Sequence, residues 1–282
     1  MKIITVARDM QRTIRAEKRA GKSVGFVPTM GYLHEGHRRL LTNARRENDL
    51  VVLSIFVNPT QFGPNEDFET YPRDMNRDEK IAEEAGVDFI FFPAVQEMYH
   101  DEPSVNVTVQ NRTAVLCGRK RPGHFDGVAT VLTKLFHIIQ PDKAYFGMKD
   151  AQQIAVIDGL IKDFHFDIEL VPVPTVREED GLAKSSRNVY LHQEERREAK
   201  ELYQSLQLAK RAIEDGVASP ARIAGMIREH LEASTSGEVD YIEIYSYPDL
   251  EPLEKLKGKI IIALAVKFKQ ARLIDNITMA LS

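Results

Sequence analysis

The chain has 282 residues, of which 43% are hydrophobic and 28% charged, and its formal net charge is −4 at pH 7. This is the composition of an ordinary globular protein with room for one large domain or two smaller ones, and it lacks the concentrated Lys and Arg excess of a nucleic-acid-binding surface. The N-terminal residues contain no apolar signal core and no apolar run approaches transmembrane length, so we expect a cytoplasmic protein with neither nucleic-acid nor membrane partners.

The first half of the chain alternates helix and strand patterns. Apolar residues at helical spacing predict helices over residues 5–20, 36–48, 73–85, 126–139 and 150–164. Apolar runs predict strands over residues 23–27, 49–57, 87–92, 143–146 and 167–173. Strands that are apolar on both faces and separated by helices are typical of a parallel sheet covered on both sides. We therefore expect an α/β fold with a Rossmann-like, doubly wound parallel sheet.

The pattern changes after the Pro-Val-Pro sequence at residues 172–174. Two helices are predicted over 193–215 and 219–233, the second with Ser219 as N-cap and proline at its first position. Three strand-like runs follow over 239–246, 259–266 and 271–278. This pattern predicts a nucleotide- and substrate-binding domain over 1–175 and a smaller α+β lid domain over 176–282.

Residues 24–37, which read VGFVPTMGYLHEGH, form the most informative segment. An apolar run is followed by a small-residue loop, and His34 and His37 flank Gly36 where a helix is predicted to begin. The backbone N–H groups and the positive dipole end of a helix start favour anions, two imidazoles can add hydrogen bonds to phosphate oxygens, and Gly36 leaves room for a nucleotide. A zinc site of the H-E-x-x-H type is not formed, because Arg38 stands where the second His would be. Ordinary surface histidines of a first helical turn are the alternative.

Three further polar segments could contribute to the same site: NPTQ at 58–61, GMKD at 147–150 and KSSR at 184–187. The first two directly follow predicted strands, and ligands of open α/β sheets bind at the carboxyl ends of strands. The third, near the domain border, would form an anion clamp on a lid that closes over substrate. The structural alternatives are a shaped turn, a capped helix start and a polar interdomain loop.

Several motifs that would point elsewhere are absent. The residues around 21–23 resemble the end of a Walker A loop, but Ala16 occupies the position of its first glycine, and no G-x-G-x-x-G or G-x-S-x-G motif is present. Cys117 is the single cysteine, so an internal disulfide is excluded. The short basic run at 119–121 indicates a loop that meets anions or solvent. A nucleotide-binding interpretation therefore depends on H-x-G-H and K-S-S-R.

The order of these motifs resembles the pantothenate synthetase (pantoate–β-alanine ligase) family: H-x-G-H, N-P-T-Q-F, Y-P-R at Tyr71, G-x-K-D-x-x-Q and K-S-S-R-N. H-x-G-H and K-S-S-R also look like the paired signatures of the wider nucleotidyltransferase superfamily. The match extends from Pro28 to Asn188. Lys184 replaces the Met of the usual M-S-S-R form, so the role of its side chain is open.

The resemblance implies an ATP-dependent ligase that condenses (R)-pantoate with β-alanine through a pantoyl-adenylate intermediate, with ATP as a substrate. It implies a Mg²⁺ ion bound by phosphate oxygens and water, without a protein ligand. It also implies a homodimer. The residues that it implies for catalysis are His37, His34, Lys149, Ser185, Ser186 and Arg187. Those that it implies for ATP are Met30, Gly31, His34, His37, Gly147, Lys149, Asp150, Val176, Lys184, Ser185, Ser186 and Arg187. Those expected for the other substrate are Gln61, Gln153, Pro28, Met30, Phe56, Asn58, Tyr71 and Val131. Whether His37 is a proton donor or only a hydrogen-bond donor stays open.

Two other functions are compatible with parts of the pattern. A nucleotidyltransferase acting on a phosphorylated acceptor shares H-x-G-H but would need a basic acceptor pocket instead of the neutral Gln61 and Gln153. A non-catalytic nucleotide-binding protein would normally have lost a histidine or the second signature, and both are present here.

Overall fold

The computed structural model describes residues 1–64, 66, 68–100 and 103–281, and the chain divides into two compact units. The first unit combines Met1–Thr113 with Gly118–Pro174. The second combines Ala114–Cys117 with the chain from Thr175 onward. The short segment Ala114–Cys117 therefore packs with the second unit although it lies within the first in sequence. Each unit is described separately below.

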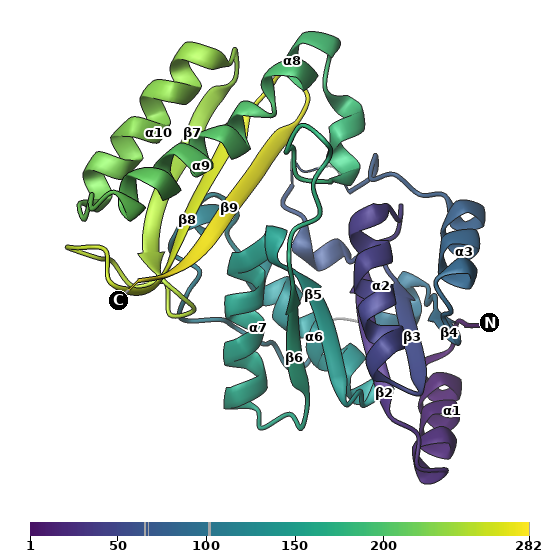
Figure 1. Ribbon diagram of the computed structural model, residues 1–282. Helices are drawn as coiled ribbons and strands as arrows, with labels where there is room; N and C mark the ends of the chain where they lie inside the picture. Colours follow the sequence, from purple (N-terminus) through teal and green to yellow (C-terminus); the bar gives the residue numbers. More distant parts are fainter. Residues whose placement is uncertain (65, 67, 101–102, 282) are drawn as a thin grey trace. The chain divides into compact units, whose positions relative to one another are not determined.

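The first unit contains a six-stranded sheet in the order β1-β4-β3-β2-β5-β6, and every neighbouring pair is parallel (Figure 1). The strands are β1 (Lys2–Ile4), β2 (Val24–Thr29), β3 (Leu50–Ile55), β4 (Phe89–Phe91), β5 (Lys143–Gly147) and β6 (Glu169–Val173). The sheet confirms the predicted doubly wound fold. Sequence reasoning missed β1, a three-residue edge strand too short to show a pattern.

The connecting helices of this unit are α1 (Ala7–Arg19), α2 (Glu35–Glu47), α3 (Met75–Glu84), α4 (Val95–Met98), α6 (His124–Ile139) and α7 (Ala151–Asp163), and α5 (Leu116–Lys120) lies across the border of the units. The short turns η1 (Pro59–Gln61) and η2 (Met148–Asp150) precede α3 and α7. The α6 helix begins two residues before the predicted Asp126, after Gly123 in a left-handed conformation with φ 78°. The short α4 and α5 helices were not predicted, because one turn of helix carries too few residues for periodicity to be visible.

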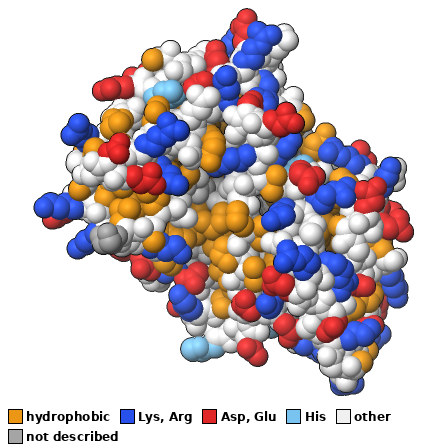
Figure 2. Space-filling view, viewed as in Figure 1, with side chains coloured by type: hydrophobic (Ala, Val, Ile, Leu, Met, Phe, Trp, Pro, Cys, Tyr) orange, Lys and Arg blue, Asp and Glu red, His pale blue; other side chains and the backbone are white. Residues whose placement is uncertain are grey.

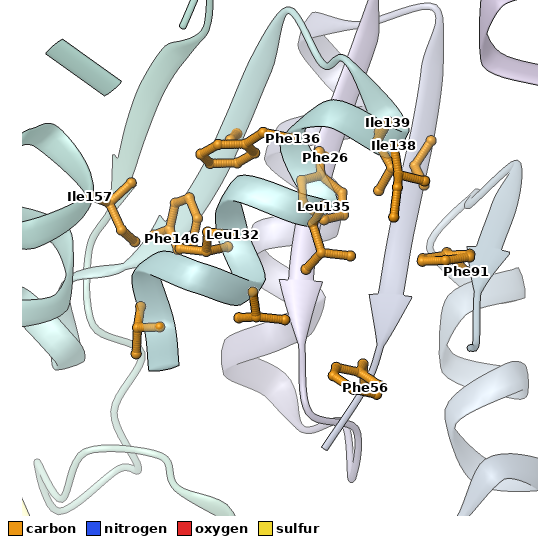
Figure 3. Close-up of a cluster of buried hydrophobic side chains, with 14 of the residues drawn as sticks. Phe26, Phe56, Phe91, Leu132, Leu135, Phe136, Ile138, Ile139, Phe146 and Ile157 are labelled. Atoms are coloured by element: carbon orange, nitrogen blue, oxygen red, sulfur yellow. The ribbon is translucent and has the colours of Figure 1, made fainter. Parts of the chain in front are cut away.

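Alternate residues of the central strands point to opposite faces of the sheet, and each face has its own apolar core. Val24 and Phe26 contribute to the core that includes residues of α1, α6 and α7, whereas Val27 contributes to the core that includes residues of α2 and α3. Figure 3 shows the first core, with Phe26 and Phe136 among the rings at its centre and Phe56 beyond the strand arrowheads. The two cores fix the sheet from both sides, so the loops at its carboxyl edge start from a rigid base.

The second unit is an α+β structure with the three-stranded antiparallel sheet β7-β8-β9 (Figure 1). Its strands are β7 (Glu238–Ser246), β8 (Gly258–Lys267) and β9 (Arg272–Leu281), and its helices are α8 (Gln193–Glu198), α9 (Glu201–Glu214) and α10 (Pro220–Ser234). The single helix predicted over 193–215 is wrong, because the helix is interrupted at Ala199 and Lys200. The apolar spacing continues across the break, which is why the sequence did not reveal it.

In the part of the chain that the structure describes, none of the helices combines the length and apolarity needed to cross a bilayer. On the face drawn in Figure 2, Lys and Arg side chains are interspersed with Asp and Glu. This mixture agrees with the small net charge of −4.

Candidate active site

The carboxyl ends of β3, β2 and β5, three adjacent strands, carry three of the polar segments found in the sequence. β3 leads into Asn58 and Gln61, β2 into His34 and His37, and β5 into Lys149. After β2 the chain adds β3 on one side of that strand, and it later adds β5 on the opposite side of β2. This is the topological switch point of the sheet, where open α/β folds bind ligands.

The rings of the two histidines at the start of α2 both accept hydrogen bonds from backbone N–H groups of the same turn. The His34 ring accepts a hydrogen bond from the Gly36 N–H at its Nδ1 atom (3.1 Å), and the His37 ring accepts one from the His34 N–H at Nδ1 (3.2 Å). The ring centroids are 4.1 Å apart. Because Nδ1 is an acceptor in both rings, each neutral imidazole carries its proton on Nε2 and can donate from that atom.

The protonation state of His37 follows from its surroundings. Desolvation, followed by the neighbouring His34 and Lys149, lowers the pKa of His37 well below its usual value of 6.5. His37 is therefore neutral at pH 7. The charge of Lys149, which follows the adjacent strand β5, contributes to this lowering of the pKa of His37.

Gly36 is required by the packing of the His34 ring. A Cβ atom at this position would lie 2.8 Å from Cε1 and 3.0 Å from Nδ1 of His34. The space that a side chain would need is thus filled by the His34 ring, and the glycine permits the capping contact between the two.

The loop between β2 and α2 is held by an acidic residue that the sequence did not single out. Asp78 of α3 is 1% exposed, and its carboxylate accepts hydrogen bonds from the N–H groups of Tyr32 (2.8 Å) and Leu33 (2.6 Å). Gly31 and Tyr32 both have positive φ, 87° and 51°. A Cβ on Gly31 would lie 3.0 Å from Asp78 Oδ2, so glycine is needed for conformation and for space. In the sequence, Asp78 resembles any acidic residue of a charged helix.

The turn after β3 is a buried hydrogen-bond network. Asn58 is 1% exposed, and its Nδ2 atom donates to Gln61 Oε1 (2.9 Å) and to the Gly127 carbonyl (3.1 Å). Its Oδ1 atom accepts from the Tyr99 hydroxyl (2.8 Å) and the Thr60 hydroxyl (3.0 Å). Because the Oε1 atom of Gln61 already accepts from Asn58, its amide nitrogen is the group left to donate elsewhere.

The remaining residues of the first unit that were expected to line the site differ in their surroundings. Phe56 and Val131 are buried in one core cluster, and the buried Tyr71 ring lies 6.0 Å from that of Phe62. Pro28, the last but one residue of β2, and Met30, the first residue after the strand, are both half-exposed. Gly147, the last residue of β5, is half-exposed, and its Cβ position is open.

Two neighbouring glutamines at the start of α7 have different surroundings. The Gln152 amide donates to the Arg112 carbonyl (2.9 Å), and its Oε1 atom accepts from the Gly118 N–H (3.3 Å), so this side chain is committed to structure. Gln153 is half-exposed. Asp150 is exposed and stands at the N-cap position of α7, as the structural alternative expects, but its side chain makes no cap hydrogen bond.

The K-S-S-R segment belongs to the second unit, where a hairpin-like turn supports it. The Lys184 N–H donates to the Val176 carbonyl (2.9 Å), and Ser185 caps the turn η3 (Ser186–Tyr190) by accepting from the Arg187 N–H (3.3 Å). Lys184 Nζ lies 3.8 Å from Glu178 Oε1. The segment is therefore an ordered turn, not an irregular loop.

Glu178 and Arg177 hold this turn to the rest of the second unit. Glu178 accepts from Arg196 (2.6 Å) and from Asn188 (3.2 Å). Burial opposes ionisation of Glu178, but these donors hold its pKa below the ordinary value. Arg177 forms a bidentate ion pair with the buried Asp275 (2.7 and 2.9 Å). None of these supporting residues was found from the sequence, because long-range ion pairs leave no local pattern.

Comparison with known proteins identifies the class of enzyme. The family described as pantoate-beta-alanine ligase matches residues 2–278, and the chain belongs to this family. A pantothenate synthetase of Geobacillus sp. (strain WCH70) is 66% identical over 279 residues, covering 99% of each chain. One of Bacillus pumilus (strain SAFR-032) is 62% identical over 277 residues, covering 98% of this chain and 96% of the relative.

Solved structures agree with this assignment. The pantothenate synthetase of Thermus thermophilus superimposes with a TM-score of 0.92 at 45% identity, covering 98% of this chain and 99% of that one. The pantoate-beta-alanine ligase of Francisella tularensis, complexed with beta-gamma ATP and beta-alanine, has a TM-score of 0.80 at 34% identity and covers 98% of this chain and 97% of that one.

Proposed function

We propose that this protein condenses (R)-pantoate with β-alanine at the expense of ATP, giving pantothenate, AMP and pyrophosphate through a pantoyl-adenylate intermediate. The observation that carries the proposal is the meeting of three polar segments at the carboxyl ends of adjacent strands β3, β2 and β5. Membership of the pantoate–β-alanine ligase family supports the substrates. The sequence order of the motifs supports the same assignment.

The chemistry requires activation of the acid before the amine attacks. A carboxylate is a poor electrophile, so the pantoate carboxylate first attacks the α-phosphorus of ATP, forming the mixed anhydride and releasing pyrophosphate. The β-alanine amine then attacks the acyl carbon, the acyl–oxygen bond breaks and AMP leaves. The first step builds negative charge on the departing pyrophosphate, and donors placed in advance for that charge supply catalysis.

The ATP phosphates would be bound from the start of α2 and the end of β5. His34, His37 and Lys149 would contact the β- and γ-phosphates, with the backbone of Met30, Gly31 and Gly147 beside the nucleotide and Asp150 at the ribose hydroxyls. His37 would act as a neutral Nε2–H donor, because its pKa is lowered and its Nδ1 atom already accepts a hydrogen bond. A general-acid role would require ATP binding to raise this pKa first.

The second unit would supply the clamp on the departing pyrophosphate. Ser185, Ser186 and Arg187 would donate to phosphate oxygens, and Val176 would contact the adenine side through its backbone. The Lys184 ammonium, which lies 3.8 Å from the Glu178 carboxylate, would exchange this partner for a phosphate when ATP binds. Arginine and serine donors suit phosphate geometry.

Pantoate would be held by amides and an apolar wall. Gln61 would donate from its amide nitrogen, since its oxygen is used by Asn58, and Gln153 would bind from the first turn of α7. Asn58 would act by orienting Gln61, because both contacts of its Nδ2 atom lie within the protein. The gem-dimethyl group would pack on four apolar side chains, with Tyr71 nearby: Pro28, Met30, Phe56 and Val131.

A magnesium ion would be bound mainly by the substrate. Among residues 1–64, 66, 68–100 and 103–281, no three His, Cys, Asp or Glu side chains gather in a group that could hold a metal. A phosphate-bound Mg²⁺ with water ligands needs no such group and fits this donor set. When bound with ATP, the ion would supply positive charge to the phosphate oxygens.

A homodimer in the cytoplasm is the expected working form. The edge strand β1 and its surroundings expose Met1, Ile3, Val6 and Phe92, and burying such apolar side chains is what a subunit interface provides. Light scattering on the purified protein would test this: a mass of one chain at micromolar concentration would contradict it.

The deciding experiment measures pyrophosphate and AMP separately from one reaction with ATP and Mg²⁺. We expect a burst of pyrophosphate, stoichiometric with enzyme, only when pantoate is present, and AMP turnover only after β-alanine is added. Pyrophosphate release that is equal with and without pantoate, or that needs a phosphorylated acceptor, would refute the proposal.

A further inference from the structure

The main chain of the turn at Gln61 is bound by a histidine that the sequence alone does not single out. His124, the first residue of α6, places Nδ1 2.8 Å from the Gln61 carbonyl oxygen. Arg121 donates from Nη1 to the other ring nitrogen of His124 over 2.9 Å, and from Nη2 to the same Gln61 carbonyl over 3.3 Å. Gln61 is thus fixed through its side chain by Asn58 and through its main chain by His124 and Arg121.

The hydrogen bonds assign the tautomer of His124. An arginine guanidinium has donors and no acceptor, so Nε2 of His124 must be the unprotonated nitrogen. A carbonyl oxygen can only accept, so Nδ1 must carry the proton. This is the opposite assignment from His34 and His37, whose Nδ1 atoms both accept from backbone N–H groups.

Burial and the charge of Arg121 keep the His124 ring neutral. Glu66 pairs with the guanidinium of Arg121 through Oε1 (2.7 Å) and Oε2, so the arginine is held in place. Burial, followed by the charge of Arg121, lowers the pKa of His124 to about 4, against smaller raising effects of the Gln61 carbonyl, Glu66 and Asp150. In a protonated ring Nε2 would also be a donor, and the hydrogen bond from Arg121 to this atom would be lost.

We propose that His124 is a positioning residue for pantoate binding: its Nδ1–H, oriented by Arg121, holds the Gln61 carbonyl so that the Gln61 side chain meets the substrate. The inference rests on the proposed function, in which Gln61 binds pantoate. His124 itself touches neither substrate nor reacting atoms in this account. Packing supports the same turn, because a Cβ on Gly127, one turn further along α6, would lie 2.3 Å from the Thr60 carbonyl oxygen.

Three substitutions of His124 distinguish the effect of its hydrogen bond to Gln61 from the effect of its side-chain volume. In His124→Asn the amide nitrogen occupies the place of Nδ1 and can still donate to Gln61. In His124→Gln the amide lies near the place of Nε2, and in His124→Leu no donor remains. We expect the Asn variant to keep the pantoate KM within about twofold, and the Gln and Leu variants to raise it roughly tenfold, the effect of one lost hydrogen bond. The ATP KM should stay unchanged in all three.

His137 offers a matched control on the same helix, since its Nδ1 atom lies 2.8 Å from the Thr133 carbonyl while its side chain is exposed at the other end of α6. His137→Leu should leave the pantoate KM unchanged. Circular dichroism and the ATP KM report whether each variant is folded. Equal losses in the Asn and Gln variants, or no change in either, would overturn the inference.

Imidazole ¹⁵N NMR of the unliganded protein tests the tautomer without activity. The His124 signal, assigned by its loss in His124→Asn, should show a protonated Nδ1 and a bare Nε2. The reverse tautomer would overturn the inference even if the protein is a pantoate ligase. Failure of the proposed function would appear separately, as pyrophosphate release by the wild-type protein that does not depend on pantoate.

Discussion

Asp78 should be indispensable for the loop that leads into His34 and His37, the two histidines of the candidate site. Its buried carboxylate accepts from the N–H groups of Tyr32 and Leu33, just before His34. In Asp78→Ala both donors lose their acceptor, at about 1–3 kcal/mol each, so we expect the free energy of unfolding to fall by about 3 kcal/mol. Asp78→Asn keeps one acceptor oxygen and should cost about half as much.

The pKa of Asp78 explains why the Asn variant should be milder. Burial raises this pKa above the ordinary value, more than the Leu33 and Tyr32 hydrogen bonds lower it. Ionised Asp78 therefore already costs the folded state some stability at neutral pH, and a neutral amide removes that cost. The side chain is kept for the two hydrogen bonds that shape the turn, not for its charge.

The assay combines urea unfolding with hydrogen exchange at the Tyr32 and Leu33 amides. Both amides should exchange much faster in Asp78→Ala, and the first-step rate should fall because His34 and His37 lose their fixed position. Asp74→Ala is the control: it removes the N-cap of the same helix, where Asp74 Oδ1 accepts from the Arg77 N–H (3.1 Å), and should cost about 1 kcal/mol without affecting these amides. Unchanged exchange in Asp78→Ala, with a stability loss under about 0.5 kcal/mol, would refute the reasoning.

Three further predictions concern other parts of the chain. Lowering the pH from 6.5 toward 4 should reduce the free energy of unfolding by up to about 3 kcal/mol through His124, because in this window the unfolded chain binds a proton that the folded chain does not. The free energy of unfolding should depend less on pH in His124→Asn, and an equal dependence in both proteins would contradict this. Gly127→Ala should lower the melting temperature and raise the pantoate KM, since its Cβ would lie 2.3 Å from the Thr60 carbonyl oxygen. Gly225→Ala in α10, where the space at the Cβ is open, should instead raise the melting temperature. The reverse order of melting temperatures would contradict the close contact between Gly127 and Thr60. Ser219→Ala should cost about 1 kcal/mol in urea unfolding by removing the cap to Arg222 N–H, and no change would show that the cap contributes nothing.

The sequence was sufficient for the fold of the first unit because its central strands are apolar on both faces and its main helices are long. β3, for example, is buried at all six positions. It was insufficient where structure depends on few residues or on distant contacts. The break at Ala199 and the short β1 strand carry no local pattern, and the assignment of Ala114–Cys117 to the second unit depends on contacts such as Leu116 N–H to Glu243 (3.0 Å).

The candidate site shows the same division. His34, His37 and Lys149 could be proposed from the sequence because they stand in short motifs directly after predicted strands. Their supports could not be found in the same way. Asp78 and His124 act across 45 and 63 positions of sequence, on Leu33 and Gln61, and each is a single residue in an unremarkable helix. Motifs indicate which groups meet a ligand, whereas the groups that orient them are determined by tertiary packing.

The central claim is that two distant segments, H-x-G-H of the first unit and K-S-S-R of the second, bind one triphosphate. A crystal structure with pantoate and α,β-methylene ATP, whose α–β bridge cannot be cleaved, tests it most directly. We predict that His37 Nε2 and at least one hydroxyl of Ser185 or Ser186 lie within about 3.2 Å of oxygens of the same triphosphate. A triphosphate contacted by only one of the two segments would contradict the account.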